Sequence, residues 1–161
     1  MLYQSDYMEE KAILQTAARM CAAARTAPKA HGRDTLHTLV LTGEEKENLA
    51  KKMEEVGRRE MGDGMNTWYG RDAGNVRAAQ AVVLIGTDRK QRGVPHCGYC
   101  GFGDCGGCKD SGGNCAYTYV DLGIAVSSAV SAAASDKTDC RIMYSVGKTA
   151  AEMEYGHDAV W

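Results

Sequence analysis

The sequence HCGYCGFGDCGGCKDSGGNC, residues 96–115, is the most unusual part of this chain. Five of the seven cysteines fall in the 19 residues from Cys97 to Cys115, and seven more of these residues are glycine. A segment with so few apolar side chains cannot form a hydrophobic core, so another interaction must hold it together. Thiolates bound to a metal centre would do so. Glycines let the backbone turn between such ligands and bring amide N–H groups close to the sulfurs.

The cysteine spacing favours an iron–sulfur cluster over a zinc ion. Structural zinc sites usually join two C-x2-C pairs across a spacer of commonly about 12 residues or more. Here the pairs Cys97/Cys100 and Cys105/Cys108 are separated by only four residues, which is crowded for one tetrahedral ion. A cluster tolerates ligands that lie so close in sequence. A segment of redox-active thiols without metal is the least favoured interpretation.

Two sets of four cysteines fit the order of ligands. The order C-x2-C-x4-C with a later cysteine is present as Cys97, Cys100, Cys105 and Cys115. This order resembles the small four-iron domain of several anaerobic electron-transfer proteins, whose pattern is Cys-Gly-x-Cys-Gly-x3-Cys and a distant cysteine. The resemblance implies one [4Fe–4S] cluster with these four ligands, although the gap to the last cysteine is shorter here. The competing set replaces Cys115 by Cys108.

The rest of the chain reads as alternating helices and strands. Apolar periodicity predicts helices over 7–25, 44–61 and 117–135, shorter helices over 73–79 and 147–153, and strands over 36–41, 81–85 and 141–146. Capping boxes at Asp6/Glu9 and Thr42/Glu45 mark two helix starts. The helix over 44–61 is charged and is expected to face solvent, and 62–74 is expected to be a loop. We therefore expect one α+β (mixed α/β) domain over 1–161, with the cysteine segment 96–116 as an embedded module.

Composition excludes several classes of function. Lys+Arg is 19 and Asp+Glu is 21, and no basic stripe is present, so no nucleic-acid partner is expected. The longest weakly polar run, Leu122–Ala134, contains three serines and is too short to span a bilayer, so no membrane partner is expected. The odd cysteine count and the acidic N-terminus MLYQSDYMEE favour a cytoplasmic protein. Cys21 and Cys140, outside the cysteine segment, are expected to be buried core thiols.

Two stretches of the chain resemble known families. Residues 97–147, with DLGIA at 121–125 and RIMYSVG at 141–147, resemble the uncharacterised ferredoxin-domain-containing proteins of anaerobes. Residues 23–34, followed by the strand over 36–41 and an acidic helix, resemble the start of nitroreductase-type flavoproteins. The second resemblance implies a nitroreductase-like sheet flanked by helices, with the cysteine loop inserted before the central small-residue helix. It also implies a homodimer that binds FMN at the subunit interface.

The candidate flavin contacts depart from the nitroreductase pattern. The family's Ser, Asn and Gln positions hold Lys29, Gly32 and Asp34, and its arginine-rich phosphate motif is absent. Arg25, Lys29 and Arg33 are the candidate phosphate ligands, because these three cations lie in one short stretch. The alternative is that they are ordinary surface charges of a solvated loop.

The sequence thus predicts an iron–sulfur redox protein of anaerobic metabolism, acting in electron transfer or flavin-dependent oxidoreduction. Its expected partner is a redox protein or a small-molecule electron acceptor. No Ser/His/Asp order or carboxylate pair indicates side-chain catalysis, so the chemistry would belong to the cofactor. The alternative is a structural or sensory module, holding zinc or a cluster, without catalytic activity.

Overall fold

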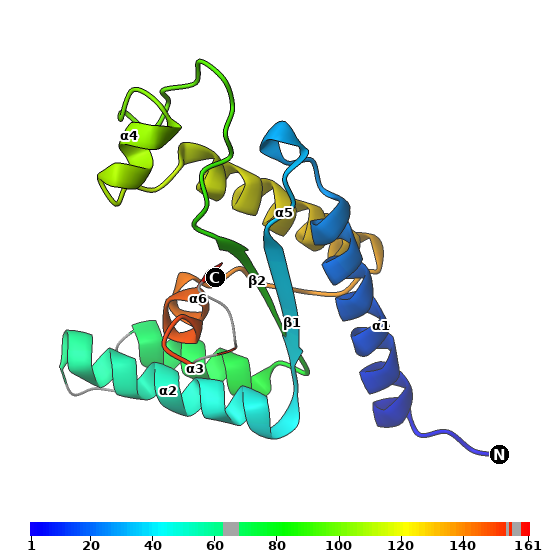
Figure 1. Cartoon of the computed structure of the whole chain (residues 1–161). Helices are drawn as coiled ribbons and strands as arrows, with labels where there is room; N and C mark the ends of the chain where they lie inside the picture. The colour runs from blue at the N-terminus through cyan, green and yellow to red at the C-terminus, as the bar shows by residue number, and fades with distance from the viewer. Residues whose placement is uncertain (63–67, 154, 156–158) are drawn as a thin grey trace.

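The computed structural model describes residues 1–62, 68–153, 155 and 159–161, and its helices lie on both sides of a small sheet (Figure 1). The helices are α1 (Ser5–Thr26), α2 (Gly43–Met61), α3 (Trp68–Ala78), α4 (Cys105–Asp110), α5 (Ala116–Ser135) and α6 (Tyr144–Ala150), with a 3-10 turn η1 (Ala30–Gly32). The strands β1 (Leu36–Leu41), β2 (Val82–Asp88) and β3 (Ala159–Val160) form an antiparallel sheet in the order β1-β2-β3. The predicted mixed α/β class is confirmed.

The sheet separates two hydrophobic clusters because side chains alternate along its strands. Strands β1 and β2 pair from Leu36↔Thr87 to Leu41↔Val82. Leu41 and Leu84 belong to the cluster with α2, α3 and α6. Leu36 and Ile85 belong to the cluster with α1 and α5 on the other face.

The layer of α1 and α5 is built from small side chains. Ala24, Ala125 and Ala129 are fully buried in it. Small residues let the two helix backbones approach closely. At the end of α5, Asp136 Oδ2 accepts a hydrogen bond from Thr16 Oγ1 at 2.8 Å and pairs with Arg19.

The opposite layer corrects two expectations. Helix α2 exposes its charged side but buries Leu49, Met53 and Val56, so it is amphipathic rather than simply solvent-facing. The apolar residues recur every three or four positions between charged ones, which places them on one face. The expected loop over 62–74 is wrong from Trp68 onward, where α3 begins and buries Tyr69; residues 63–67 lie outside the described part of the chain.

The expected strand over 141–146 is wrong, because α6 begins at Tyr144. Ser145 Oγ donates a hydrogen bond to Asp72 Oδ2 at 2.6 Å, and both residues are buried. Val146 and Ala150, one helical turn apart, join the same core as α2. Tertiary packing therefore overrides the local strand propensity of this segment.

Smaller expectations also changed. The N-cap of α1 is Gln4 rather than Asp6, and Thr42 is the N-cap of α2 without a side-chain hydrogen bond. Cys140 is exposed and Cys21 is only half-buried, so neither is a fully buried core thiol. None of the described helices is long and apolar enough to cross a membrane.

Candidate metal centre

The cysteine module, residues 96–116, lies between β2 and α5 and projects beyond the ends of the strands (Figure 1). Its first part is a tight turn in which Gly101 N donates to Gly98 O at 2.9 Å. Gly98 and Gly101 have φ values of +63° and +83°, a region that other residues adopt only with strain. Each of these glycines follows a cysteine, so the chain turns sharply directly after Cys97 and Cys100.

The second part of the module is α4, which begins at Cys105. Asp104 is its N-cap, and Asp104 Oδ1 accepts a hydrogen bond from Gly107 N at 2.8 Å. A Cβ added at Gly107 would lie 2.5 Å from the carbonyl oxygen of Phe102, so the backbone packs tightly here. The turn and α4 therefore fit together through backbone rather than through apolar side chains.

The module has almost no hydrophobic core, as the sequence predicts. Its only buried side chains are those of Cys108 and Cys115, at 0% and 6% exposure. Tyr99 is 77% exposed and Phe102 is 41% exposed. The Phe102 ring packs over Gly113, where an added Cβ would come within 2.4 Å of it. The module's order must therefore come largely from interactions of its thiols and backbone.

Cys108 lies near two other thiols of the module. All seven cysteines of the chain are free, so no disulfide competes for the module's sulfurs. Cys100 and Cys115 are the cysteines that neighbour the Cys108 thiol. Gln91 Nε2 donates to Cys108 Sγ at 3.8 Å. Burial raises the pKa of the Cys108 thiol; the Gln91 hydrogen bond opposes this rise and the neighbouring Cys100 adds to it.

The four predicted ligands do not converge on one point in the structure. Within residues 1–62, 68–153, 155 and 159–161, no three His, Cys, Asp or Glu side chains are arranged to hold a metal ion. Cys97 and Cys115 both lie within electrostatic range of Tyr117, whose pKa is raised by burial first and then by Cys97. Binding one centre would thus require the sulfurs to shift together.

The donors near the thiols fit an iron–sulfur centre. Thr118 Oγ1 is buried and has no hydrogen-bond partner among the described residues. Thr118 lies on α5 one turn beyond Cys115, and its amide donates to the Cys115 carbonyl at 3.0 Å. Gln91 Nε2 donates to a free thiol directly, at Cys108 Sγ. Thiolates with N–H or O–H donors around them are the surroundings in which protein-bound clusters are held and their potentials adjusted.

Two of the three candidate phosphate ligands have other partners in the structure. Lys29 Nζ is largely buried and donates to the carbonyl oxygens of Ala24, Arg25 and Ala27, so it caps the end of α1. Arg25 Nη1 pairs with Asp34 Oδ2 at 2.8 Å. Burial alone would raise the pKa of Asp34, but the Arg25 hydrogen bond lowers it on balance. Only Arg33, whose guanidinium lies against Gly93, makes no ion pair within the described residues.

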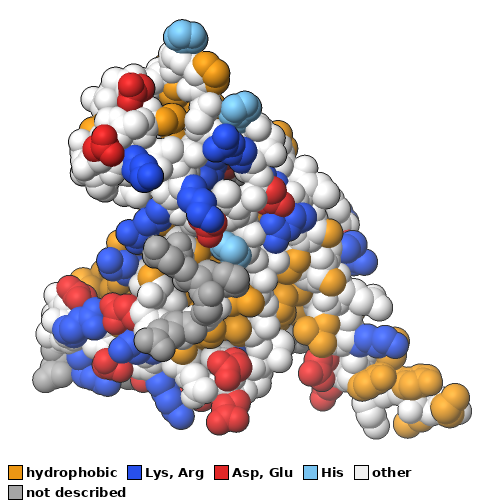
Figure 2. Space-filling model, viewed as in Figure 1, with side chains coloured by type: hydrophobic (Ala, Val, Ile, Leu, Met, Phe, Trp, Pro, Cys, Tyr) orange, Lys and Arg blue, Asp and Glu red, His pale blue; other side chains and the backbone are white. Residues whose placement is uncertain are grey.

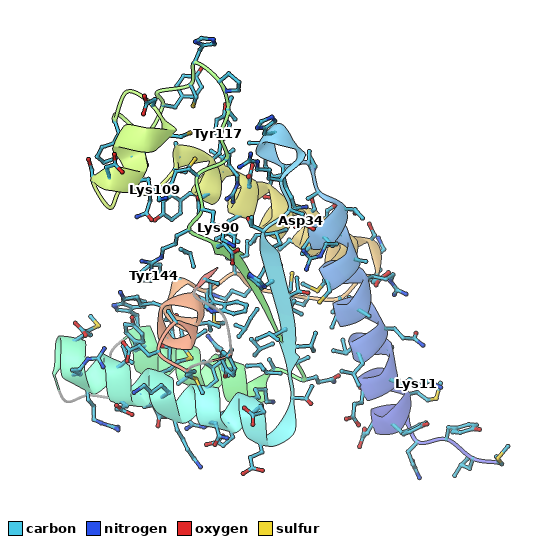
Figure 3. The ribbon with its side chains drawn as sticks, viewed as in Figure 1. Lys11, Asp34, Lys90, Lys109, Tyr117 and Tyr144 are labelled. Carbon is cyan, nitrogen blue, oxygen red and sulfur yellow. The ribbon has the colours of Figure 1, made fainter. Side chains whose placement is uncertain are left out.

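Positive charge gathers beside the module. Figure 2 shows Lys and Arg side chains around the junction between the module and the rest of the molecule. Lys90 and Lys109 lie on this face (Figure 3). Lys90 Nζ pairs with Asp88 Oδ2 at 2.9 Å, whereas Lys109 makes no ion pair among the residues that the structure describes. This face suits the approach of a negatively charged molecule.

Sequence reasoning missed the polar residues that support the module. Gln91 carries no motif, and only the structure places its side chain beside Cys108. It also missed the buried ion pair between Arg92 and Asp121, at 1% and 3% exposure. One signal was present, because Asp121 is the single charged residue of the 20-residue helix α5. A lone charge in an apolar helix usually has a partner.

The fold and the site define a class: a small α/β protein that carries a cysteine-rich module suited to a metal centre. The chain belongs to the family described as "Uncharacterized protein containing a ferredoxin domain (DUF2148)", whose model matches residues 111–160. It is 38% identical over 161 residues to an "Uncharacterized protein" of Archaeoglobus fulgidus. That match covers 95% of this chain and 84% of the relative.

The family confirms one resemblance and leaves the other without support. The similarity to ferredoxin-domain-containing proteins is confirmed. A ferredoxin domain is the kind of domain that carries an iron–sulfur cluster for electron transfer. The matched residues include Cys115 but begin after the other four cysteines of the module, Cys97, Cys100, Cys105 and Cys108. No solved structure matches the chain, so the nitroreductase-like fold stays a prediction.

Proposed function

We propose that this protein is an iron–sulfur redox protein that holds one [4Fe–4S] cluster in its cysteine module and transfers single electrons. The observation that supports the proposal most is the module itself, with five free thiols in one short segment that has almost no apolar core. Such a cluster, when bound, takes up and releases one electron at a time. The electron comes from a reduced donor and passes to an oxidised acceptor, and no bond forms or breaks in the protein.

The proposed ligands are Cys97, Cys100, Cys105 and Cys115. Cys108 is the competing ligand, and its burial and its contact with Cys100 argue for testing it directly. Single Cys→Ser variants distinguish the two sets. Under the first set, Cys108→Ser keeps the full iron content and Cys115→Ser loses it; under the second, the two results are exchanged.

FMN is not part of the proposal. The cations that would contact its phosphate, Arg25 and Lys29, are already engaged with Asp34 and with the end of α1. We therefore favour an electron carrier over a flavin-dependent oxidoreductase. The positive face around Lys109 supports an acidic redox protein as the partner, with a small anionic electron acceptor as the alternative.

The remaining parts of the proposal concern location and assembly. Seven thiols, none of them in a disulfide, are typical of a reducing compartment, which supports the cytoplasm of an anaerobe. A homodimer is proposed on the resemblance to nitroreductases alone. The second candidate function is a structural or sensory module, which the buried Cys108 and its hydrogen bond to Gln91 would serve equally well with zinc.

Redox titration of the reconstituted protein tests the proposed function. Protein purified and loaded with iron and sulfide without oxygen is reduced with dithionite and then mixed with a one-electron acceptor. We expect one electron per chain to be taken up, a paramagnetic signal on reduction, and loss of both on reoxidation. The Cys100→Ser variant is the control and should take up none. A metal-loaded protein that cannot be reduced supports the structural module instead.

A further inference from the structure

The two ends of the cysteine module meet at one buried ion pair. Arg92 precedes the module and Asp121 follows it, and Arg92 Nε donates to Asp121 Oδ2 at 2.8 Å. Both side chains are almost completely buried, at 1% and 4% side-chain exposure. The pair therefore bridges the chain where it enters the module and where it leaves it.

Both members of the pair make further hydrogen bonds. Arg92 Nη1 donates to Lys90 O at 2.7 Å and Nη2 to Thr87 Oγ1 at 3.1 Å. Asp121 Oδ1, its second oxygen, accepts from Ala30 N at 3.0 Å. One charged pair thus joins the end of β2, the loop after it, η1 and α5. A planar guanidinium that donates hydrogen bonds in three directions fixes the relative orientation of the segments it joins, as well as the distance between them.

Little else holds the module to the rest of the molecule. Helix α4 has no extensive packing against another helix or strand. Two further side-chain contacts join the module to its surroundings. Gln91 Nε2 donates to Cys108 Sγ at 3.8 Å and to Gly113 O at 3.5 Å, and the ring centroids of Tyr99 and Tyr117 lie 6.2 Å apart. Buried ion pairs add little net stability compared with apolar residues of the same volume, so geometry is the main effect of this one.

We infer that Arg92 and Asp121 are positioning residues that clamp the two ends of the cysteine module and hold Cys97 and Cys115 on the same side of the molecule. The clamp acts through the backbone and touches no sulfur itself. Its effect on a cluster rests on the proposed function, whereas its effect on the order of the module does not.

Hydrogen–deuterium exchange of the metal-free protein tests the clamp. The double variant Arg92→Met, Asp121→Leu replaces the pair by apolar residues of similar volume, which commonly leaves folding intact. We expect exchange within 97–115 to become about tenfold faster, while the peptides of α2 and α3 stay at wild-type rates. The matched control is Asp72→Asn, which weakens another buried polar pair, with Ser145, on the far side of the sheet.

The outcomes separate the two claims. Wild-type exchange rates within 97–115 in the double variant overturn the clamp, whether or not metal binds. If the wild-type protein binds no iron, the proposed function fails and the exchange result still decides on the clamp. If it binds iron, release of iron to a chelator should be about tenfold faster in the double variant than in Asp72→Asn. Equal release rates in these two variants overturn the positioning role.

If the double variant does not fold, Arg92→Lys answers the same question. Lysine keeps the charge beside Asp121 but cannot reach Thr87 Oγ1 and Lys90 O at once. We expect exchange within 97–115 to be faster than in the wild type. A wild-type rate in this variant contradicts a clamp that depends on the guanidinium fork.

Discussion

The body of the molecule and its cysteine module are stabilised in different ways. The body buries large apolar side chains on one face of the sheet, with Leu49, Met53 and Val56 at 0% exposure. The module buries only Cys108 and Cys115. Apolar burial contributes about 1.5–3 kcal/mol for each large side chain, so this effect favours folding of the body. The module lacks such burial, and its order depends on backbone turns, the clamp and, under our proposal, thiolate ligation.

The largest expected effect breaks the module and leaves the body intact. In Cys100→Ser we expect complete loss of bound iron, because a serine hydroxyl replaces a thiolate ligand. The melting temperature of the metal-free protein should stay the same, since Cys100 adds nothing to either core. Iron assay and thermal unfolding measure both.

Cys140→Ser is the matched control for this prediction. Cys140 is exposed and lies outside the module, so the variant should keep its iron. Wild-type iron content in Cys100→Ser would contradict the proposed ligand set, and equal losses in both variants would point to a general defect in loading.

The second expected effect is a loss of stability of the body. Leu49→Ala should lower the free energy of unfolding by about 2–5 kcal/mol, because Leu49 is fully buried between α2 and its neighbours. The iron bound per folded chain should not change. Urea unfolding measures the loss, and the exposed Leu2→Ala, at 86% exposure, is the control with a change within about 0.5 kcal/mol. A large loss of iron in folded Leu49→Ala would show that the two regions are not independent.

A smaller effect sharpens the view that the module packs through its backbone. In Gly107→Ala the new Cβ would lie 2.5 Å from Phe102 O, so α4 and the turn before it must move apart. We expect faster exchange within 97–115 and unchanged melting of the body. Gly123→Ala on α5 has open space around its Cβ and should leave the module at wild-type rates. Identical exchange in the two variants would contradict the tight backbone contact.

The smallest effect concerns the pH dependence of the body. The hydrogen bonds from Arg19 and Thr16 hold the pKa of Asp136 below its usual value. A carboxyl with a lowered pKa stabilises the folded state above its ordinary pKa, and this contribution is lost as the pH falls through the lowered value. Asp136→Asn should therefore melt slightly lower than wild type at neutral pH, with the difference disappearing in acid. A difference that persists in acid, or one matched by Asp139→Asn, would contradict this account.

The comparison also explains what the sequence could predict. The cysteine module can be predicted from the sequence because the spacing of cysteines indicates a metal centre. The scarcity of apolar residues among Cys97–Cys115 also predicts that the module has almost no hydrophobic core. The segment 141–146 was mistaken for a strand because its local propensity conflicts with the burial of Val146 and Ala150 on one helical face. The many charged residues of α2 favour a solvent-facing helix in the sequence, although its apolar residues are buried on one face. The clamp joins Arg92 to Asp121 across the module, and no local pattern contains both residues.

Metal content measured on protein purified without oxygen tests the central claim most directly. Iron, acid-labile sulfide and zinc are assayed on the same sample together with the absorption spectrum. The account predicts about four irons and four sulfides per chain with a broad band near ~400 nm, as expected for a cluster held by thiolates. A colourless protein with one zinc and no sulfide would contradict it and make the cysteine module a structural zinc site.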